Sequence, residues 1–176
     1  DFLFGDYYTT GPYIAKYDSN GDYIWARHLA ELPRSFNIDA NQNIILAGSF
    51  EVNTSYNIDT TIYFVDGTAI YYTMMGSNMW DGPNSYIAKL DSLGKYVWFN
   101  YFESGDNNEV NSVVLDNQNN ILVLGYNYGS GDFIALHDTL HFTYQSVERS
   151  SYFLKISSNG DFLMAKSGVR NLYFMN

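Results

Sequence analysis

Two histidines, His137 and His141, are four residues apart, which is the spacing of a metal-binding pair on a helix. The segment that holds them, IALHDTLHFTY, alternates between apolar and polar residues in the manner of a strand. Residues four apart on a strand are separated by roughly 13 Å, so their side chains cannot share one ion. We therefore predict that these histidines are structural and form no metal site.

A second candidate for metal chemistry is the acidic loop in which Asp106, Asn108 and Glu109 offer the side-chain oxygens that calcium prefers. Two interpretations stay open, a solvated turn, which we favour, and a calcium site. The run that begins at Asp18 is similar to the start of a calcium loop. Its glycine, however, is fourth rather than sixth, and Leu29 stands where such a loop needs Glu. We interpret that run as a turn and expect no cofactor.

No residue is marked out as a catalytic nucleophile. The glycine-rich run at 129–131 is not followed by the lysine and helix of a phosphate-binding loop, and no G-x-S-x-G motif is present. The 19 acidic residues include no pair that the sequence singles out for glycoside hydrolysis. We therefore predict that this segment is not an enzyme.

Aromatic residues make up 18% of the chain, and several of them cluster in residues 51–85. Rigid amphipathic rings provide contact area for binding at a small entropic cost. Two interpretations are open: the rings form a rim that binds a protein or a glycan, or they pack an extra hairpin against the rest of the fold. The candidate binding residues are Tyr56, Tyr63, Tyr71, Tyr72 and Trp80.

The elements that would position these residues repeat along the chain. One segment occurs three times, as YIAKYDSNGDYIWA at 13–26, YIAKLDSLGKYVWF at 86–99 and YFLKISSNGDFLMA at 152–165. Two apolar runs flank a DSNG, DSLG or SSNG turn, in which the fixed glycine supplies the positive φ of a bulged turn. Each copy therefore predicts a β-hairpin.

The second strand of the first hairpin, within GDYIWAR, is apolar at successive positions. Strict alternation would place Tyr23 and Trp25 on one face and Ile24 and Ala26 on the other. Because both faces are largely apolar, we expect this strand to be covered on both sides.

A second segment occurs twice, as DANQNIILAG at 39–48 and DNQNNILVLG at 116–125, and FLFG at 2–5 is similar to its end. Its Asn/Gln cluster predicts a turn between two strands. The unit is thus strand, Asn-rich turn, strand, variable segment, strand, SNG-type turn, strand. Four antiparallel strands make one blade of a β-propeller. The predicted fold class is all-β, with two to three tandem blades that form part of a larger ring.

The variable segments contain strand-like stretches, TTIYFV and DFIALHDTLHF. We expect them to form extra hairpins on one face of the ring, where repeat proteins often bind their partners. A closed propeller has roughly four to eight blades, and the chain starts with Asp1 rather than Met. We therefore expect a removed leader or a piece of a longer polypeptide with further blades. The predicted units are a partial blade at 1–34, a blade at 35–109 with insertion 51–85, a blade at 110–168 with insertion 128–150, and the start of a next blade or a tail at 169–176.

These segments resemble the β-propeller repeat family often called SBBP. The matching segments are 13–25, 39–48, 86–98 and 116–125. The third hairpin departs from the family pattern, with Ser157 in place of Asp and Met164 in place of Trp. The resemblance implies a scaffold or binding module without shared catalytic residues. It also implies a secreted or cell-surface protein of Bacteroidetes-type bacteria, exported by type IX secretion.

Composition excludes several classes of partner and of protein architecture. A net charge of −10 with only 9 Lys and Arg provides no basic face for nucleic acid. The chain has no cysteine, which excludes a disulfide scaffold, and no apolar run as long as a membrane helix. We expect an extracellular or bacterial cell-surface location and a protein or glycan partner. Two alternatives stay open: an accessory propeller of a multidomain secreted enzyme, or a propeller enzyme with its active site in the central funnel.

Overall fold

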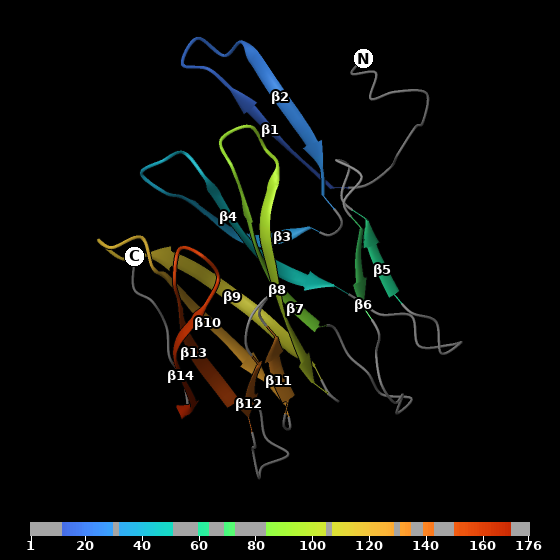
Figure 1. Cartoon of the computed structure of the whole chain (residues 1–176), viewed down its shortest axis with the longest axis vertical. Helices are drawn as coiled ribbons and strands as arrows, with labels where there is room; N and C mark the ends of the chain where they lie inside the picture. The colour runs from blue at the N-terminus through green and yellow to red at the C-terminus, as the bar shows by residue number, and fades with distance from the viewer. Residues whose placement is uncertain are drawn as a thin grey trace.

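The computed structural model describes residues 12–29, 32–50, 60–63, 69–72, 84–104, 107–128, 131–134, 139–142 and 150–169. Every element within these ranges is a β-strand, and all paired strands are antiparallel. Figure 1 shows the sheets following one another along the long axis of the molecule, from β1 and β2 at the top to β13 and β14 at the bottom. The predicted all-β class is confirmed.

Two of the sheets contain a complete four-stranded blade, and a third sheet is a single hairpin. The first hairpin pairs β1 (Tyr13–Tyr17) with β2 (Tyr23–His28). The second blade consists of β3 (Pro33–Ile38), β4 (Ile44–Phe50), β7 (Asn84–Leu90) and β8 (Tyr96–Ser104), side by side in this order. The third blade consists of β9 (Asn108–Leu115), β10 (Ile121–Asn127), β13 (Ser150–Ile156) and β14 (Phe162–Val169). The predicted tandem of four-stranded antiparallel blades is therefore present.

The variable segments add two short hairpins. One pairs β5 (Thr60–Tyr63) with β6 (Ala69–Tyr72), and the other pairs β11 (Gly131–Ile134) with β12 (Thr139–Phe142). We expected the β11–β12 hairpin to lie on one face of the ring, but it instead extends the sheet of the preceding blade. It pairs with the end of β8 and lengthens the preceding sheet to six strands, because the edge of β8 offers backbone groups that need a partner.

Five turns that join consecutive blade strands share one geometry. In the turn that begins at Asp91, the N–H of Gly94 donates to the Asp91 carbonyl at 2.9 Å, and the N–H of Asp91 donates to the Lys95 carbonyl at 2.8 Å. The φ of Gly94 is +76°, in the left-handed region that the turn glycine was predicted to supply. The equivalent residues in the other turns are Gly21, Gln42, Asn119 and Gly160, all with positive φ.

The face assignment from strict alternation is wrong for the last strand of each hairpin. In the register, Leu90 pairs with Tyr96 and Lys89 pairs with Trp98, so Val97 is an extra residue that forms a β-bulge. Tyr96 consequently packs in the core between the first hairpin and the second blade, whereas Trp98 belongs to the core between the second and third blades. The same shift separates Tyr23 from Trp25.

Apolar residues form a core at each junction between blades. The first core joins Trp25 and Leu29 to the strands β4 and β7. The second core joins Trp98 and Phe102 to strands β9, β10 and β13. The central strands of the second blade are thus covered on both faces. The strand for which the sequence predicted two covered faces, β2, is covered only in part, because Trp25 and Ala26 are buried whereas Tyr23 and Ile24 are about half exposed.

A glycine near the end of the second strand makes room for a tyrosine from the third strand. Gly48 pairs with Tyr86, and Gly125 pairs with Tyr152. A Cβ on Gly48 would lie 2.9 Å from the Tyr86 ring, and one on Gly125 would overlap the Tyr152 ring. The last residue of the NIILAG and NILVLG repeats is therefore glycine because an aromatic ring lies directly over it.

Candidate functional site

Each complete blade contains an aspartate that is tied to its turn and to a lysine. In the second blade, Asp39 is 5% exposed, and its Oδ1 accepts hydrogen bonds from the backbone N–H groups of Asn41 at 2.9 Å and Asn43 at 2.8 Å. Its Oδ2 accepts a bond from Asn43 Nδ2 at 2.8 Å and pairs with Lys89 Nζ at 3.2 Å. The third blade repeats this set with Asp116, whose Oδ2 is 2.9 Å from Lys155 Nζ.

These contacts fix the ionisation of both aspartates. Burial alone would raise the pKa of Asp39, but the hydrogen bonds from Asn43 and Lys89 more than offset it, and its pKa lies below the ordinary value. Lys155, followed by Asn120, holds the pKa of Asp116 well below its usual range. Both aspartates are therefore ionised at neutral pH, and each is paired with a lysine. A general acid or base needs a pKa near the working pH, so neither aspartate suits that role.

At each of the two described junctions between blades, a tryptophan of the preceding repeat binds the turn of the next one, a contact that we call a tryptophan lock. The indole Nε1–H of Trp25 donates to the Ser92 carbonyl at 3.1 Å, and that of Trp98 donates to the Ser158 carbonyl at 3.2 Å. The ring also lies over the turn glycine, since a Cβ on Gly94 would be 3.0 Å from the Trp25 ring. Both tryptophans are 6% exposed, so each lock is shielded from water.

A lysine completes each of these locks. Lys89 Nζ donates to the Ser158 carbonyl at 3.1 Å while it pairs with Asp39, so one ammonium joins two blades. Lys16 Nζ lies 3.5 Å from the Ser92 carbonyl in the preceding junction. The lysine and tryptophan that the hairpin repeat contains at fixed positions are therefore the residues that join one blade to the next.

The second and third blades are also joined through strands β3 and β9. Arg34 forms an ion pair with Glu109. The Ser35 hydroxyl accepts a hydrogen bond from the backbone N–H of Val113 at 3.1 Å. Glu109, one of the calcium candidates, is thus engaged with an arginine.

The other two calcium candidates are Asn108 and Asp106. Asn108 begins β9 and is fully buried, and neither atom of its side-chain amide has a hydrogen-bond partner. Asp106 lies outside the described residues. Within the described part of the chain, no group of three or more His, Asp or Glu side chains could hold a metal ion.

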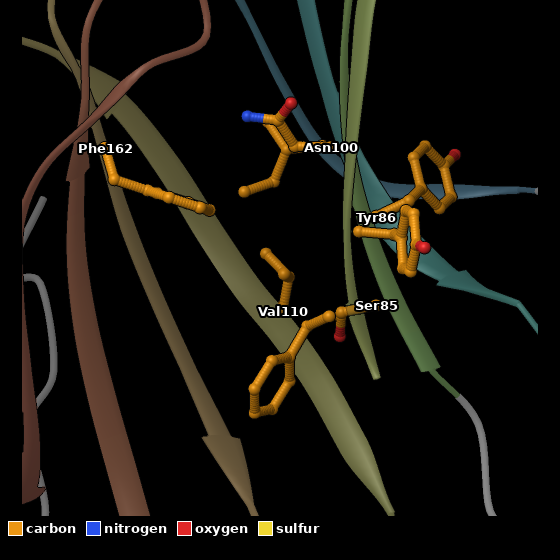
Figure 2. Close-up of a pocket in the computed structure, with 8 residues that line it drawn as sticks. Ser85, Tyr86, Asn100, Val110 and Phe162 are labelled. Atoms are coloured by element: carbon orange, nitrogen blue, oxygen red, sulfur yellow. The ribbon is translucent and has the colours of Figure 1, made fainter. Parts of the chain in front are cut away.

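A small cavity lies between the second and third blades. Its enclosed space is about 10 Å³, room for about one water molecule, and it is lined by Ser85, Tyr86, Ile87, Asn100, Tyr101, Phe102, Val110 and Phe162. Figure 2 shows the Phe162 side chain extending from β14 toward the side chains of the neighbouring blade. Ligand sites for small molecules usually occupy roughly 300–1,000 Å³. We therefore interpret this cavity as a gap in blade packing rather than a substrate site.

The aromatic binding candidates are placed only in part. Tyr63 ends β5 opposite Ala69, while Tyr71 and Tyr72 end β6 opposite Thr61 and Thr60. Tyr56 and Trp80 lie outside the described residues, as does His137. His141 is on β12, opposite Asp132. The structure thus brings three of the five candidate aromatics onto one hairpin.

Sequence reasoning missed the role of the lysine and tryptophan of the hairpin repeat. Their recurrence at Lys16, Lys89 and Lys155, and at Trp25 and Trp98, was the available signal. It gave no sign of a partner in the next blade, because that contact joins residues more than sixty positions apart.

No helix among the described residues is long and apolar enough to cross a membrane.

No family model matches this chain. An uncharacterized WD repeat-containing protein of Acanthamoeba polyphaga mimivirus is 26% identical over 121 residues, which is 66% of this chain. The match covers 8% of that protein's length, so the chain spans a small part of this relative. Together with the antiparallel four-stranded sheets, this similarity identifies the chain as a tandem of β-propeller blades.

Proposed function

We propose that the chain is a non-catalytic scaffold that binds a partner protein through the hairpins of its variable segments. The observation that carries this proposal is the placement of the β5–β6 hairpin. It is inserted between the second and third strands of a blade whose own strands pair with one another and with β11. The hairpin is thus an addition to the blade, and it carries Tyr63, Tyr71 and Tyr72.

The rest of the molecule supports a rigid framework. Each junction between blades combines an apolar core, an indole hydrogen bond and a lysine contact. Asp39 and Asp116 are bound to lysines, which leaves them unsuited to proton transfer. The similarity to a WD repeat-containing protein also favours a repeat module over an enzyme.

The partner class and the location belong to the same proposal. Tyrosine-rich surfaces suit protein partners because the rings lose little conformational entropy on binding. The net charge of −10 favours a partner with a basic surface. The resemblance to SBBP repeats favours a secreted or cell-surface protein. We propose no cofactor, and millimolar calcium is expected to leave the melting temperature unchanged.

Binding by a variant of the β5–β6 hairpin tests the proposal. The immobilised chain is presented to secreted and surface proteins of its source, and separately to a glycan array. We expect binding to a protein, and we expect the double variant Tyr71→Ala, Tyr72→Ala to weaken that binding by about tenfold or more. Circular dichroism checks that the variant is folded.

Val97→Ala is the matched control, because Val97 is 54% exposed on β8 and outside the hairpin. Unchanged binding by this control is expected. If the hairpin variant binds every protein as tightly as the unmodified chain does, the hairpin is not the binding surface. Binding to a glycan alone, lost in the hairpin variant, would instead assign the surface to carbohydrate.

A further inference from the structure

Asparagine is followed by glycine at only two places in the chain, and both are turns with the sequence SNGD, at 19–22 and 158–161. In this pair of residues the backbone nitrogen of the glycine can attack the side-chain amide carbon of the asparagine, because glycine has no side chain to hinder the approach. Asn20 and Asn159 are both exposed, and within the described part of the chain neither side-chain amide forms a hydrogen bond. Both residues therefore meet the chemical requirement for deamidation.

The two turns differ in what lies over the glycine. Their internal hydrogen bonds match, since the N–H of Gly160 donates to the Ser157 carbonyl at 3.0 Å and that of Gly21 donates to the Asp18 carbonyl at 3.1 Å. Gly160, however, is buried, and a Cβ on it would lie 3.1 Å from the Trp98 ring. Gly21 is exposed, and a Cβ on it would meet nothing within 4 Å. The tryptophan lock is thus what distinguishes two otherwise similar turns.

The second blade holds the residues on both sides of Asn159. The Ser158 carbonyl accepts the indole N–H of Trp98 at 3.2 Å, and the Gly160 carbonyl accepts a hydrogen bond from Asn100 Nδ2 at 2.7 Å. Attack on the side chain needs the backbone at Asn159 to rotate so that the glycine nitrogen reaches the amide carbon. Contacts on either side oppose that rotation for as long as the two blades stay joined.

We propose that Asn159 is a deamidation site that the tryptophan lock protects. In the reaction, the Gly160 nitrogen loses its proton and forms a bond to Cγ of Asn159, and the side-chain nitrogen leaves as ammonia, which yields a cyclic succinimide. Water then opens the ring at either carbonyl. Opening at Cγ gives aspartate, and opening at the backbone carbonyl gives isoaspartate, in which the main chain runs through the former side chain and gains a methylene group.

Isoaspartate at this position is incompatible with the closed junction. The added methylene moves Gly160 relative to Ser158, so their two carbonyls can no longer meet Asn100 and Trp98 together. The reaction therefore occurs when the junction between the second and third blades opens, and its product keeps that junction from closing again. This inference does not depend on what the β5–β6 hairpin binds.

The two SNGD turns provide the comparison that tests the proposal. The purified chain is kept in mildly alkaline buffer, and peptide mass mapping follows the replacement of each side-chain amide by a carboxyl group. We expect Asn20 to react about tenfold or more faster than Asn159, because only Asn159 has to wait for a junction to open. In concentrated urea, where the fold is lost, the two sites should react at equal rates.

The substitution Trp98→Phe removes the indole N–H that holds the turn. It should raise the rate at Asn159 by about tenfold and leave the rate at Asn20 unchanged, because the lost bond makes opening of this one junction easier. Circular dichroism verifies that the variant is folded, and the comparison of the two turns in the unmodified chain tests the proposal without it.

Asn159→Leu is the matched control, because the second blade already has leucine at the equivalent position, Leu93. After prolonged incubation the unmodified chain should contain isoaspartate at 159 and melt at a lower temperature, whereas the control should keep its melting temperature. Equal rates at Asn159 and Asn20 in the folded chain would overturn the proposal. So would a difference that persists in urea, or isoaspartate at 159 with no change in melting.

Discussion

Replacing Trp98 with phenylalanine tests the lock between the second and third blades. The substitution keeps an aromatic ring but removes the indole N–H that donates to the Ser158 carbonyl at 3.2 Å. Loss of a buried hydrogen bond costs about 1 kcal/mol net. The smaller ring also leaves a space over Gly160, and the lost apolar contact adds roughly another 1 kcal/mol.

The expected decrease in the free energy of unfolding for Trp98→Phe is therefore about 2 kcal/mol. In a chain of this size it corresponds to a fall in melting temperature of about 4–8 °C. Urea unfolding followed by far-ultraviolet circular dichroism measures the first quantity, and a thermal scan measures the second. Trp25→Phe should behave alike, since Trp25 donates to the Ser92 carbonyl at 3.1 Å.

Met164→Leu is the matched control, because Met164 occupies the equivalent position and is 41% exposed. It should change the free energy of unfolding by no more than about 0.5 kcal/mol. If Trp98→Phe and Met164→Leu had equal effects, the indole hydrogen bond would not join the blades in solution. The assignment of Trp98 as the joining residue would then be refuted.

Three further substitutions test the blade interior and its turns. Asp39→Asn leaves Lys89 without its counter-ion and should lower the free energy of unfolding by about 2 kcal/mol at neutral pH. Because the pKa of Asp39 is lower in the folded chain than its ordinary value of 3.8, its contribution is present above that pH and lost as the pH falls further. The variant and the unmodified chain should therefore converge during acid unfolding, and a constant gap would contradict this. Gly125→Ala should cost roughly 3 kcal/mol or more, because the added methyl overlaps the Tyr152 ring. Gly21→Ala has open space and should cost only about 1 kcal/mol of backbone strain. Equal melting temperatures for these two glycine variants would contradict the packing argument.

The sequence by itself predicted the class of fold, the repeating hairpins and their turns. It did so because these features are local. The positive φ at Gly94 and the Asx hydrogen bonds at Asp39 depend on residues within one turn, and the apolar runs of the strands are contiguous. The resemblance of segments such as 116–125 to propeller repeats rests on the same local pattern.

The candidate site was predictable only as a set of residue types. Tyr63, Tyr71 and Tyr72 stood out because aromatic residues cluster in the segment 51–85, and the structure places these three on one hairpin. Nothing in the sequence showed that the hairpin near Asp132 would pair with β8, since strand pairing across blades depends on which edge is open after the sheets have formed.

Only the tertiary structure decided which way the residues of each repeat face. The bulge at Val97 reverses the alternation, so that Tyr96 packs against the preceding blade and Trp98 against the following one. The partners of Lys89 and Trp98 lie in a turn 69 and 60 positions away, and only the stacking of blades brings them together. A local pattern can specify a strand and its turn. The contacts that join blades arise from the geometry of the whole array, because each blade must bury its apolar face against its neighbour.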